Sequence, residues 1–244
     1  MIDKRIKPSV YGGTEAEKSG PAGFVEVAYG NKKYGKVKYN GTGTLVFGNW
    51  FLTAAHVVVD VSPDADKLLY ASVSLGHVDR TQSPFKANAK QILYYPTYEP
   101  TYEGNLRDDL ALLQLDPAIA KGVPSAKIGP RPKVGDTVYN LGWGAQALDQ
   151  HGQPVKHPTR LRKGIYTVTE SSPAMLTFEG KSGTTSIMEG DSGGPLFNLK
   201  GELVGVVSLR PKDPTNPTVV SGASGAIPIE FYKSWLEQVA RAYA

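Results

Sequence analysis

The sequence predicts an all-β protein, built as a barrel or a sandwich, in which only the C-terminal end is helical. From Val10 onwards, short apolar runs are interrupted by Gly, Pro and Asn at close spacing. Twenty-seven glycines and 18 prolines provide many turns, and a hydrophobic content of 40% in 244 residues is enough for a packed core. Many short strands separated by turn residues are typical of barrels and sandwiches.

Nine runs have the composition of strands, and a proline-rich stretch divides them into two groups. The stretch 117–132 contains four prolines and marks the seam between two β units. We expect a leader or propeptide-like tail over 1–9, β units over 10–120 and 121–228, and a closing helix over 229–244. The expected strands are residues 24–29, 42–47, 68–75, 110–115, 137–143, 165–169, 175–178, 203–209 and 218–220.

The C-terminal stretch has the periodicity of an amphipathic helix. Phe231, Trp235, Val239 and Tyr243 recur every four residues, and Leu236 lies beside them on the same face. Apolar residues at this spacing form one side of a helix. We therefore expect a helix over 229–243 that packs this face against the β units.

Composition excludes several classes of function. The net charge is +4 and is spread along the chain without a dense basic run, which argues against a nucleic-acid partner. The absence of cysteine excludes disulfides and thiolate metal sites. No apolar run approaches the roughly 20 residues that span a bilayer, so we expect no membrane partner. The basic first residues lack the apolar segment of a signal peptide.

Residues 189–196, Glu-Gly-Asp-Ser-Gly-Gly-Pro-Leu, form the stretch with the clearest chemistry. A nucleophilic Ser needs room for a carbonyl group, a base for its proton and N–H donors for the developing oxyanion. Gly190, Gly193 and Gly194 allow a sharp turn around Ser192 and leave N–H groups unobstructed. An isolated Gly-Asp-Ser-Gly would more often be an ordinary glycine-rich turn, so the interpretation depends on partners elsewhere.

Two further stretches supply such partners. Residues 50–58 place His56 just after a strand and among small residues, and Asp108 and Asp109 open the apolar run 110–115. Each alone is more often structural: a histidine beside an apolar run, or an aspartate in a solvated turn. Together with Ser192 they stand in the order His, Asp, Ser, which is that of chymotrypsin and differs from those of subtilisin and the α/β-hydrolases.

In these motifs the sequence resembles the chymotrypsin/trypsin family of serine endopeptidases over nearly the whole chain from Val10. The motifs that carry the resemblance are residues 10–16, 52–56, 109–113, 142–144, 190–196, 207–208 and 232–235. The resemblance implies two six-stranded antiparallel β-barrels with a C-terminal helix, and an active site between the barrels. It also implies an enzyme without cofactor or metal.

The resemblance assigns a role to each motif residue. Ser192 would attack the scissile carbonyl, and His56 would take its proton and pass it to the leaving amine. Asp109, which directly precedes the Leu-Ala-Leu-Leu run, would orient His56, with Asp108 as a solvated neighbour. The N–H groups of Gly190 and Ser192 would form the oxyanion hole.

The substrate pocket departs from any single subfamily. Alignment from Ser192 places Ser186 at the pocket floor, where trypsin-like members carry Asp. We therefore expect neutral, apolar specificity, with specificity for basic residues as the alternative. Val207 stands where many glutamate-specific members have His, and an Arg210–Glu189 pair would cross the rim. The implied substrate-binding residues are Ser186, Ile187, Glu189, Val207, Ser208, Leu209 and Arg210.

The resemblance also implies activation by cleavage. A free α-amine on Val10 would fold inward and pair with Asp191, and residues 1–9 block that amine in this chain. We expect a zymogen-like form that is cut between Ser9 and Val10. Two alternatives are that a Lys pairs with Asp191 and no cut is needed, or that residues 1–9 are foreign to the natural protein.

The sequence therefore predicts a serine endopeptidase that works through an acyl-enzyme. The alternatives are a catalytically silent relative used as a binding protein, and an unrelated structural or carbohydrate-binding β protein. We expect a secreted or periplasmic monomer whose partners are protein or peptide substrates and protein protease inhibitors.

Overall fold

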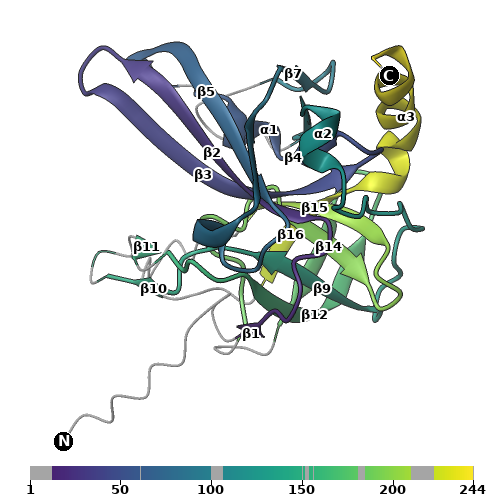
Figure 1. The fold of residues 1–244 in the computed structure, drawn as a ribbon. Coiled ribbons are helices and arrows are strands. Elements are labelled where there is room, and N and C mark those ends of the chain that lie inside the picture. The colour runs from purple at the N-terminus through teal and green to yellow at the C-terminus, as the bar shows by residue number, and fades with distance from the viewer. Residues whose placement is uncertain are drawn as a thin grey trace, which may run out of the picture.

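The structure, a computed structural model, is built mainly from two seven-stranded antiparallel β-sheets, a separate two-stranded hairpin and a C-terminal helix (Figure 1). It describes residues 13–60, 62–99, 107–149, 151, 154–155, 157–180, 185–209 and 223–243. Four expectations lie outside the described residues: the tail 1–9, the position of Val10, the strand at 218–220, and Arg210.

The first half of the chain forms a seven-stranded sheet in the order β6-β5-β2-β3-β4-β8-β7. Its longest pairing joins β2 and β3, from Ala22↔Thr44 to Asn31↔Gly35. Two short helices, α1 (Ala55–Val58) and α2 (Pro117–Ala120), accompany it. The strands are β2 (Ala22–Asn31), β3 (Gly35–Val46), β4 (Trp50–Thr53), β5 (Ala65–Leu75), β6 (Phe85–Asn88), β7 (Gln91–Tyr94) and β8 (Ala111–Gln114), and the 3-10 helix Arg80–Gln82 precedes β6.

One bent segment joins the two ends of this sheet. The strands β6 and β7 follow each other directly, and β6 pairs with β5 whereas β7 pairs with β8. At the bend, Ala89 N donates to Ala71 O and Lys90 N donates to Gln114 O. The two ends of this sheet are therefore joined through this bent segment and not by a β6–β7 ladder, and a strand that changes partners in this way must bend at the corner.

The second half of the chain forms a closed barrel. Its order is β1-β12-β13-β16-β15-β14-β9, and an additional β12–β9 pairing closes six strands into a ring, with β1 attached outside it. A separate hairpin joins β10 (Ala147–Leu148) and β11 (Pro154–Val155). The strands of this sheet are β1 (Thr14–Glu15), β9 (Thr137–Gly142), β12 (Arg162–Ser171), β13 (Leu176–Glu179), β14 (Pro195–Asn198), β15 (Leu203–Leu209) and β16 (Ala223–Pro228).

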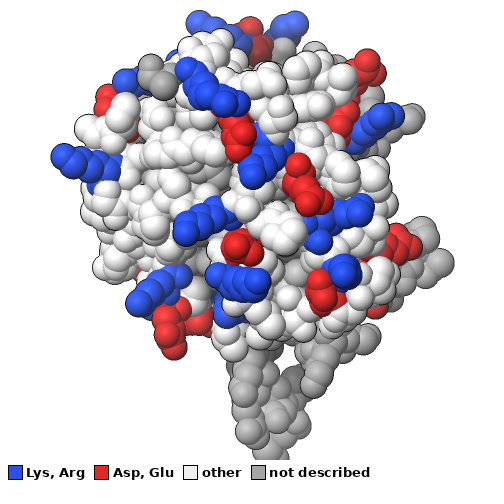
Figure 2. Space-filling model, turned by 90° about the vertical axis from the view of Figure 1, so that its right-hand side faces the viewer, with Lys and Arg blue, Asp and Glu red and all other residues white. Residues whose placement is uncertain are grey.

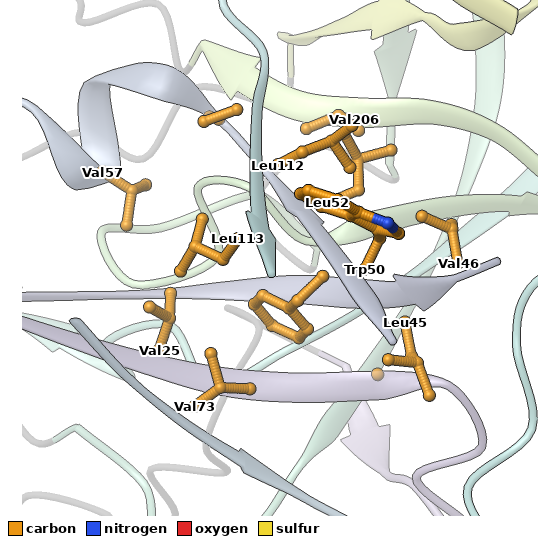
Figure 3. Close-up of a cluster of buried hydrophobic side chains, with 14 of the residues drawn as sticks. Val25, Leu45, Val46, Trp50, Leu52, Val57, Val73, Leu112, Leu113 and Val206 are labelled. Carbon is orange, nitrogen blue, oxygen red and sulfur yellow. The ribbon is translucent and has the colours of Figure 1, made fainter. Parts of the chain in front are cut away.

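Buried apolar side chains connect the two sheets. Val25, Leu52 and Leu112 of the first sheet lie in one cluster with Val206 of the second (Figure 3). Consecutive residues of β4 and β8 belong to this cluster, so these two strands are buried on both faces. Since a continuous core fixes one sheet against the other, residues carried by the two sheets can meet in a defined geometry.

The C-terminal helix is shorter than predicted and buries only part of the predicted face: Leu236, with Trp235 and Val239 packed against the core. A 3-10 helix, Ile229–Tyr232, precedes α3 (Lys233–Ala242). Tyr232 and Leu236 are buried, whereas Phe231 and Tyr243 are 46% and 47% exposed. A 3-10 helix has three residues per turn, so it rotates Phe231 away from the face that an uninterrupted α-helix would present.

The described helices could not cross a membrane, and the surface around α3 carries charges of both signs. None of them has both the length and the apolar composition needed to cross a bilayer. On the face that carries α3, basic and acidic side chains alternate without a region of one sign (Figure 2).

Candidate active site

Antiparallel pairing brings His56 and Asp109 together. Thr53 of β4 pairs with Ala111 of β8, so the residues just after β4 lie beside those just before β8. His56 Nδ1 lies 2.6 Å from Asp109 Oδ2, and the His56 backbone N–H donates to Asp109 Oδ1 at 2.8 Å. Two contacts to one carboxylate fix both the position and the orientation of the imidazole ring.

The Asp109 carboxylate is completely buried and has a third donor. Ser208 Oγ donates to Asp109 Oδ2 at 2.5 Å across the boundary between the sheets. Because Asp109 is acceptor-only when ionised, these contacts assign the proton of His56 to Nδ1 and leave Nε2 as the basic nitrogen. The resemblance gave Ser208 a place on the substrate strand, and its bond to Asp109 has no separate signal in the sequence.

The Ser192 backbone lies close to Val57, the residue that follows His56. Thr42 N donates to Ser192 O at 2.9 Å, and a Cβ added to Gly41 would lie 2.8 Å from both Ser192 O and Val57 Cγ1. Ser192 and Val57, the neighbour of His56, therefore meet on the same side of β3 at Gly41. The Ser192 hydroxyl donates to no described residue, His56 included. Catalytic contacts of this kind often tighten only when substrate binds.

The turn around Ser192 needs its glycines. Gly190 and Gly193 have φ angles of +97° and +81°, which L side chains rarely adopt. A Cβ on Gly193 would also lie 2.0 Å from Thr53 Oγ1, so this turn packs directly against the strand that leads to His56. The N–H groups of Gly190 and Ser192 donate to no acceptor in the described part of the chain, which leaves both available to an oxyanion.

Thr42 is a site residue that the sequence reasoning missed. Its Oγ1 donates to Gly190 O at 2.8 Å and accepts from Trp143 N at 3.3 Å. It thereby links the first sheet to the oxyanion-hole segment. A threonine in the middle of a predicted strand carries no sequence signal for this role.

Asp191 is a fully buried carboxylate without a cation among the described residues. It accepts from Gly144 N at 2.9 Å and from Met188 N at 3.0 Å. Burial raises the pKa of Asp191 to about 7, and the two backbone donors only partly offset this. A Cβ on Gly142 or Gly144 would lie within 2.2 Å of its carboxylate oxygens, which explains why both positions are glycine.

Asp108 is not the solvated neighbour that the sequence suggested. Its φ angle is +58°, and its side chain is 13% exposed. Tyr232 Oη donates to Asp108 Oδ1 at 2.7 Å, and Thr97 Oγ1 donates to Asp108 Oδ2 at 2.5 Å. Burial and then this contact raise the pKa of Tyr232. Asp108 thus anchors the chain end to the first sheet beside the site.

The predicted pocket residues are mostly withdrawn from solvent. Ser186 is 1% exposed, and Ile187 and Val207 belong to the core of the second barrel. Leu209 is half-buried, and Glu189 is exposed. Arg210 lies outside the described residues, so the predicted rim pair with Glu189 stays a prediction. The described residues contain no group of three His, Cys, Asp or Glu that could hold a metal ion.

The buried state of Asp191 predicts a pH-dependent stability. The folded pKa of Asp191 is about 7, against an ordinary value of 3.8. The protonated Asp191 therefore adds its full contribution to the free energy of unfolding below pH 3.8, and this contribution is lost as the pH rises to 7. Relative to Asp191→Asn, the free energy of unfolding of the unchanged chain should fall by about 4 kcal/mol between pH 4 and pH 8.

Urea titrations at both pH values measure this difference. Asp66→Asn, which changes an exposed carboxyl, serves as the control and should follow the unchanged chain. If the free energies of unfolding of the unchanged chain and Asp191→Asn change in parallel with pH, the pKa of Asp191 is not raised by burial.

Known proteins resemble this chain in sequence and in fold. The sequence profile of the trypsin family matches residues 10–236. Granzyme M of Rattus norvegicus is 28% identical over 221 residues, covering 81% of this chain and 78% of that protein. Chymotrypsin-like elastase family member 1 of Canis lupus familiaris is 26% identical over 94% of this chain and 92% of its own length. An uncharacterized peptidase of Corynebacterium glutamicum is 25% identical, and the match covers 80% of this chain but 62% of that protein.

Solved structures confirm the fold class. An inactivated protease paralogue of the scabies mite superposes with a TM-score of 0.70 at 19% identity, over 95% of this chain and 97% of its own. Mouse neuropsin, a serine protease, superposes with a TM-score of 0.68 at 21% identity, over 93% and 98%. At these identities the likeness shows the fold alone. The family match over residues 10–236 shows more: the chain belongs to the trypsin family of chymotrypsin-like serine proteases.

Proposed function

We propose that this chain is an active serine endopeptidase with His56, Asp109 and Ser192 as its catalytic residues. The observation that carries the proposal is the buried Asp109 carboxylate, which holds His56 Nδ1 at 2.6 Å, with the Ser192 backbone close to Val57, the residue after His56. The rival is a silent binding protein, since one structural neighbour is an inactivated paralogue. This chain keeps all three residues at the positions the family motifs require.

The geometry supports acyl transfer in two steps. Ser192 Oγ attacks the scissile carbonyl while His56 Nε2 takes its proton, and Asp109 stabilises the imidazolium. The N–H groups of Gly190 and Ser192 stabilise the oxyanion. The intermediate collapses as His56 returns the proton to the leaving amine, which gives an acyl-enzyme. Water then attacks the ester with His56 again as base, which releases the acid product and regenerates Ser192.

The first prediction concerns this catalytic unit. Ser192→Ala and His56→Ala should each lower kcat/KM for a peptide amide by about 10⁴ or more, and the double variant should lose little more than either, because such residues act together. Ser208→Ala removes one of three donors to Asp109 and should cost only about tenfold. Near-UV circular dichroism checks that each variant is folded. Losses that add in the double variant would contradict a shared role.

We further propose neutral primary specificity, with medium or large apolar side chains before the scissile bond. Ser186 offers no charge at the buried pocket floor, and an unpaired buried cation is strongly unfavourable. Profiling the cleavage sites in a random peptide pool should therefore show few cuts after Lys, Arg, Asp or Glu. A profile dominated by Lys or Arg would show that Ser186 is not the pocket floor.

We also propose that cleavage before Val10 activates the chain. Asp191 is buried without a cation among the described residues, and the family match begins at Val10. Arg162 Nη2 donates to Gly13 O at 2.7 Å, and Arg162 pairs with Gly142, which packs against Asp191. Three extended residues span about 10 Å, so a chain running from Gly13 to Val10 is long enough to reach this region. The α-amine of Val10 in this region would pair with the buried Asp191 carboxylate, which otherwise has no opposite charge nearby among the described residues.

Active-site titration with a serine-directed phosphonate tests this activation. The chain that begins at Val10 should label fully, and the chain with residues 1–9 should label only to a small fraction, with its N-terminus confirmed by mass spectrometry. Equal labelling of the two intact chains would rule the mechanism out. Secretion or a periplasmic location, a monomeric state and inhibition by protein inhibitors stay predictions.

A further inference from the structure

We propose that the β2–β3 hairpin binds acidic side chains of a protein substrate on the leaving-group side of the scissile bond. The proposal deepens the peptidase function proposed above and rests on it. Strands β2, β3 and β5 extend together away from the C-terminal helix (Figure 1), and β3 leads directly from the candidate active site to the tip of this arm.

The face of β3 that carries Asn40, Lys38 and Lys36, here called the track, begins at the oxyanion hole. Asn40 Oδ1 lies 3.3 Å from the point where a Cβ on Gly190 would stand. Along β3, Asn40, Lys38 and Lys36 alternate with Tyr39 and Val37, so the two lysines share the face of Asn40. At about 3.3 Å per residue, Lys38 and Lys36 follow Asn40 by roughly 7 and 13 Å. A peptide of four to five residues covers this distance.

The position of Ser192 assigns this track to the leaving group. Gly193 N donates to Val207 O on β15, whereas Thr42 N donates to Ser192 O from β3. Ser192 therefore lies between β15 and β3. The family resemblance makes Val207 and Ser208 of β15 the strand that holds substrate backbone. We take this to be the acyl half, so the half that leaves as an amine passes β3.

The hairpin is basic and its lysines are exposed. Residues 27–46 contain Lys32, Lys33, Lys36 and Lys38 and no acidic residue. All four are exposed, as is Lys86, which the strand register places on the same face as Lys36 and Lys38. The α3 face, by contrast, mixes both signs (Figure 2).

Acidic neighbours offset only part of this charge. Lys38 Nζ lies 3.1 Å from Glu26 Oε1, yet its side chain remains 53% exposed and can take a second acidic partner. Lys36 Nζ lies over the Tyr70 ring, 5.0 Å from its centroid, and Asp66 lies across Gly30 on the same face. Three lysines thus face two carboxylates, with Lys32 and Lys33 in addition at the tip. This excess favours an acidic occupant by charge complementarity.

Paired peptide substrates test the proposal. Two peptides share their acyl half and carry either Glu or Gln at the second and fourth positions after the scissile bond. At low ionic strength the Glu peptide should have a kcat/KM about three- to tenfold higher, and the preference should shrink in 0.5 M salt. Lys36→Gln/Lys38→Gln should abolish the preference. Lys121→Gln/Lys200→Gln changes the charge equally outside the hairpin and should keep it.

A binding measurement separates this proposal from the peptidase function. The fluorescein-labelled leaving-half peptides are titrated into Ser192→Ala, with and without the two hairpin substitutions. Tighter binding of the Glu peptide that depends on Lys36 and Lys38 supports the surface even if no peptide is cut, in which case the peptidase function fails alone. Equal binding and equal cleavage of the Glu and Gln peptides, or a preference that survives in the double variant, overturns the surface.

Discussion

The buried carboxylate of Asp191 is the constraint on which the geometry of the site depends most. It accepts from Met188 N and Gly144 N, and so joins the segment before Ser192 to the glycine-rich end of β9. The same short segment carries the N–H groups of Gly190 and Ser192. A buried charge that lacks a cation is strongly unfavourable, so whatever pairs with Asp191 also sets the conformation of these donors. In the proposed function, stability and oxyanion binding are therefore coupled through Asp191.

Strand β3 links the proposed chemistry to the proposed substrate recognition. Thr42 holds Gly190 O and Ser192 O from the first sheet, and Gly41 leaves space where Ser192 and Val57 meet. Beyond Asn40 the same strand becomes a basic, exposed arm. A rigid strand that contacts the oxyanion hole at one end and carries lysines at the other can position a substrate relative to the reacting bond without a moving part.

The sequence predicted the parts of this structure that depend on local pattern. The motifs in their order implied the fold class and the meeting of His56 with Asp109, whereas the β4–β8 pairing that brings these residues together was not predicted. The sequence could not predict interactions that form only when distant segments pack. Ser208 bonds to Asp109 across 99 residues, and Thr42 bonds to Gly190 across 148.

Asp108 and the C-terminal helix show a second limit of sequence reasoning. The left-handed backbone of Asp108 turns its carboxylate towards Tyr232, and the 3-10 turn before α3 rotates Phe231 into solvent. Both depend on backbone geometry that residue periodicity does not encode. The bend at Ala89 and Lys90, which lets one segment serve two strands, is of the same kind.

The most direct test of this account is the titration of Asp191 itself. Carbon-13 NMR of the labelled aspartate carboxyls, with Asp191→Asn to assign the signal, reports its pKa in the chain with residues 1–9 and in the chain that begins at Val10. The account predicts a pKa of about 7 in the longer chain and a value several units lower once the Val10 amine is free. The same pKa in both chains would contradict the claim that Asp191 awaits that amine.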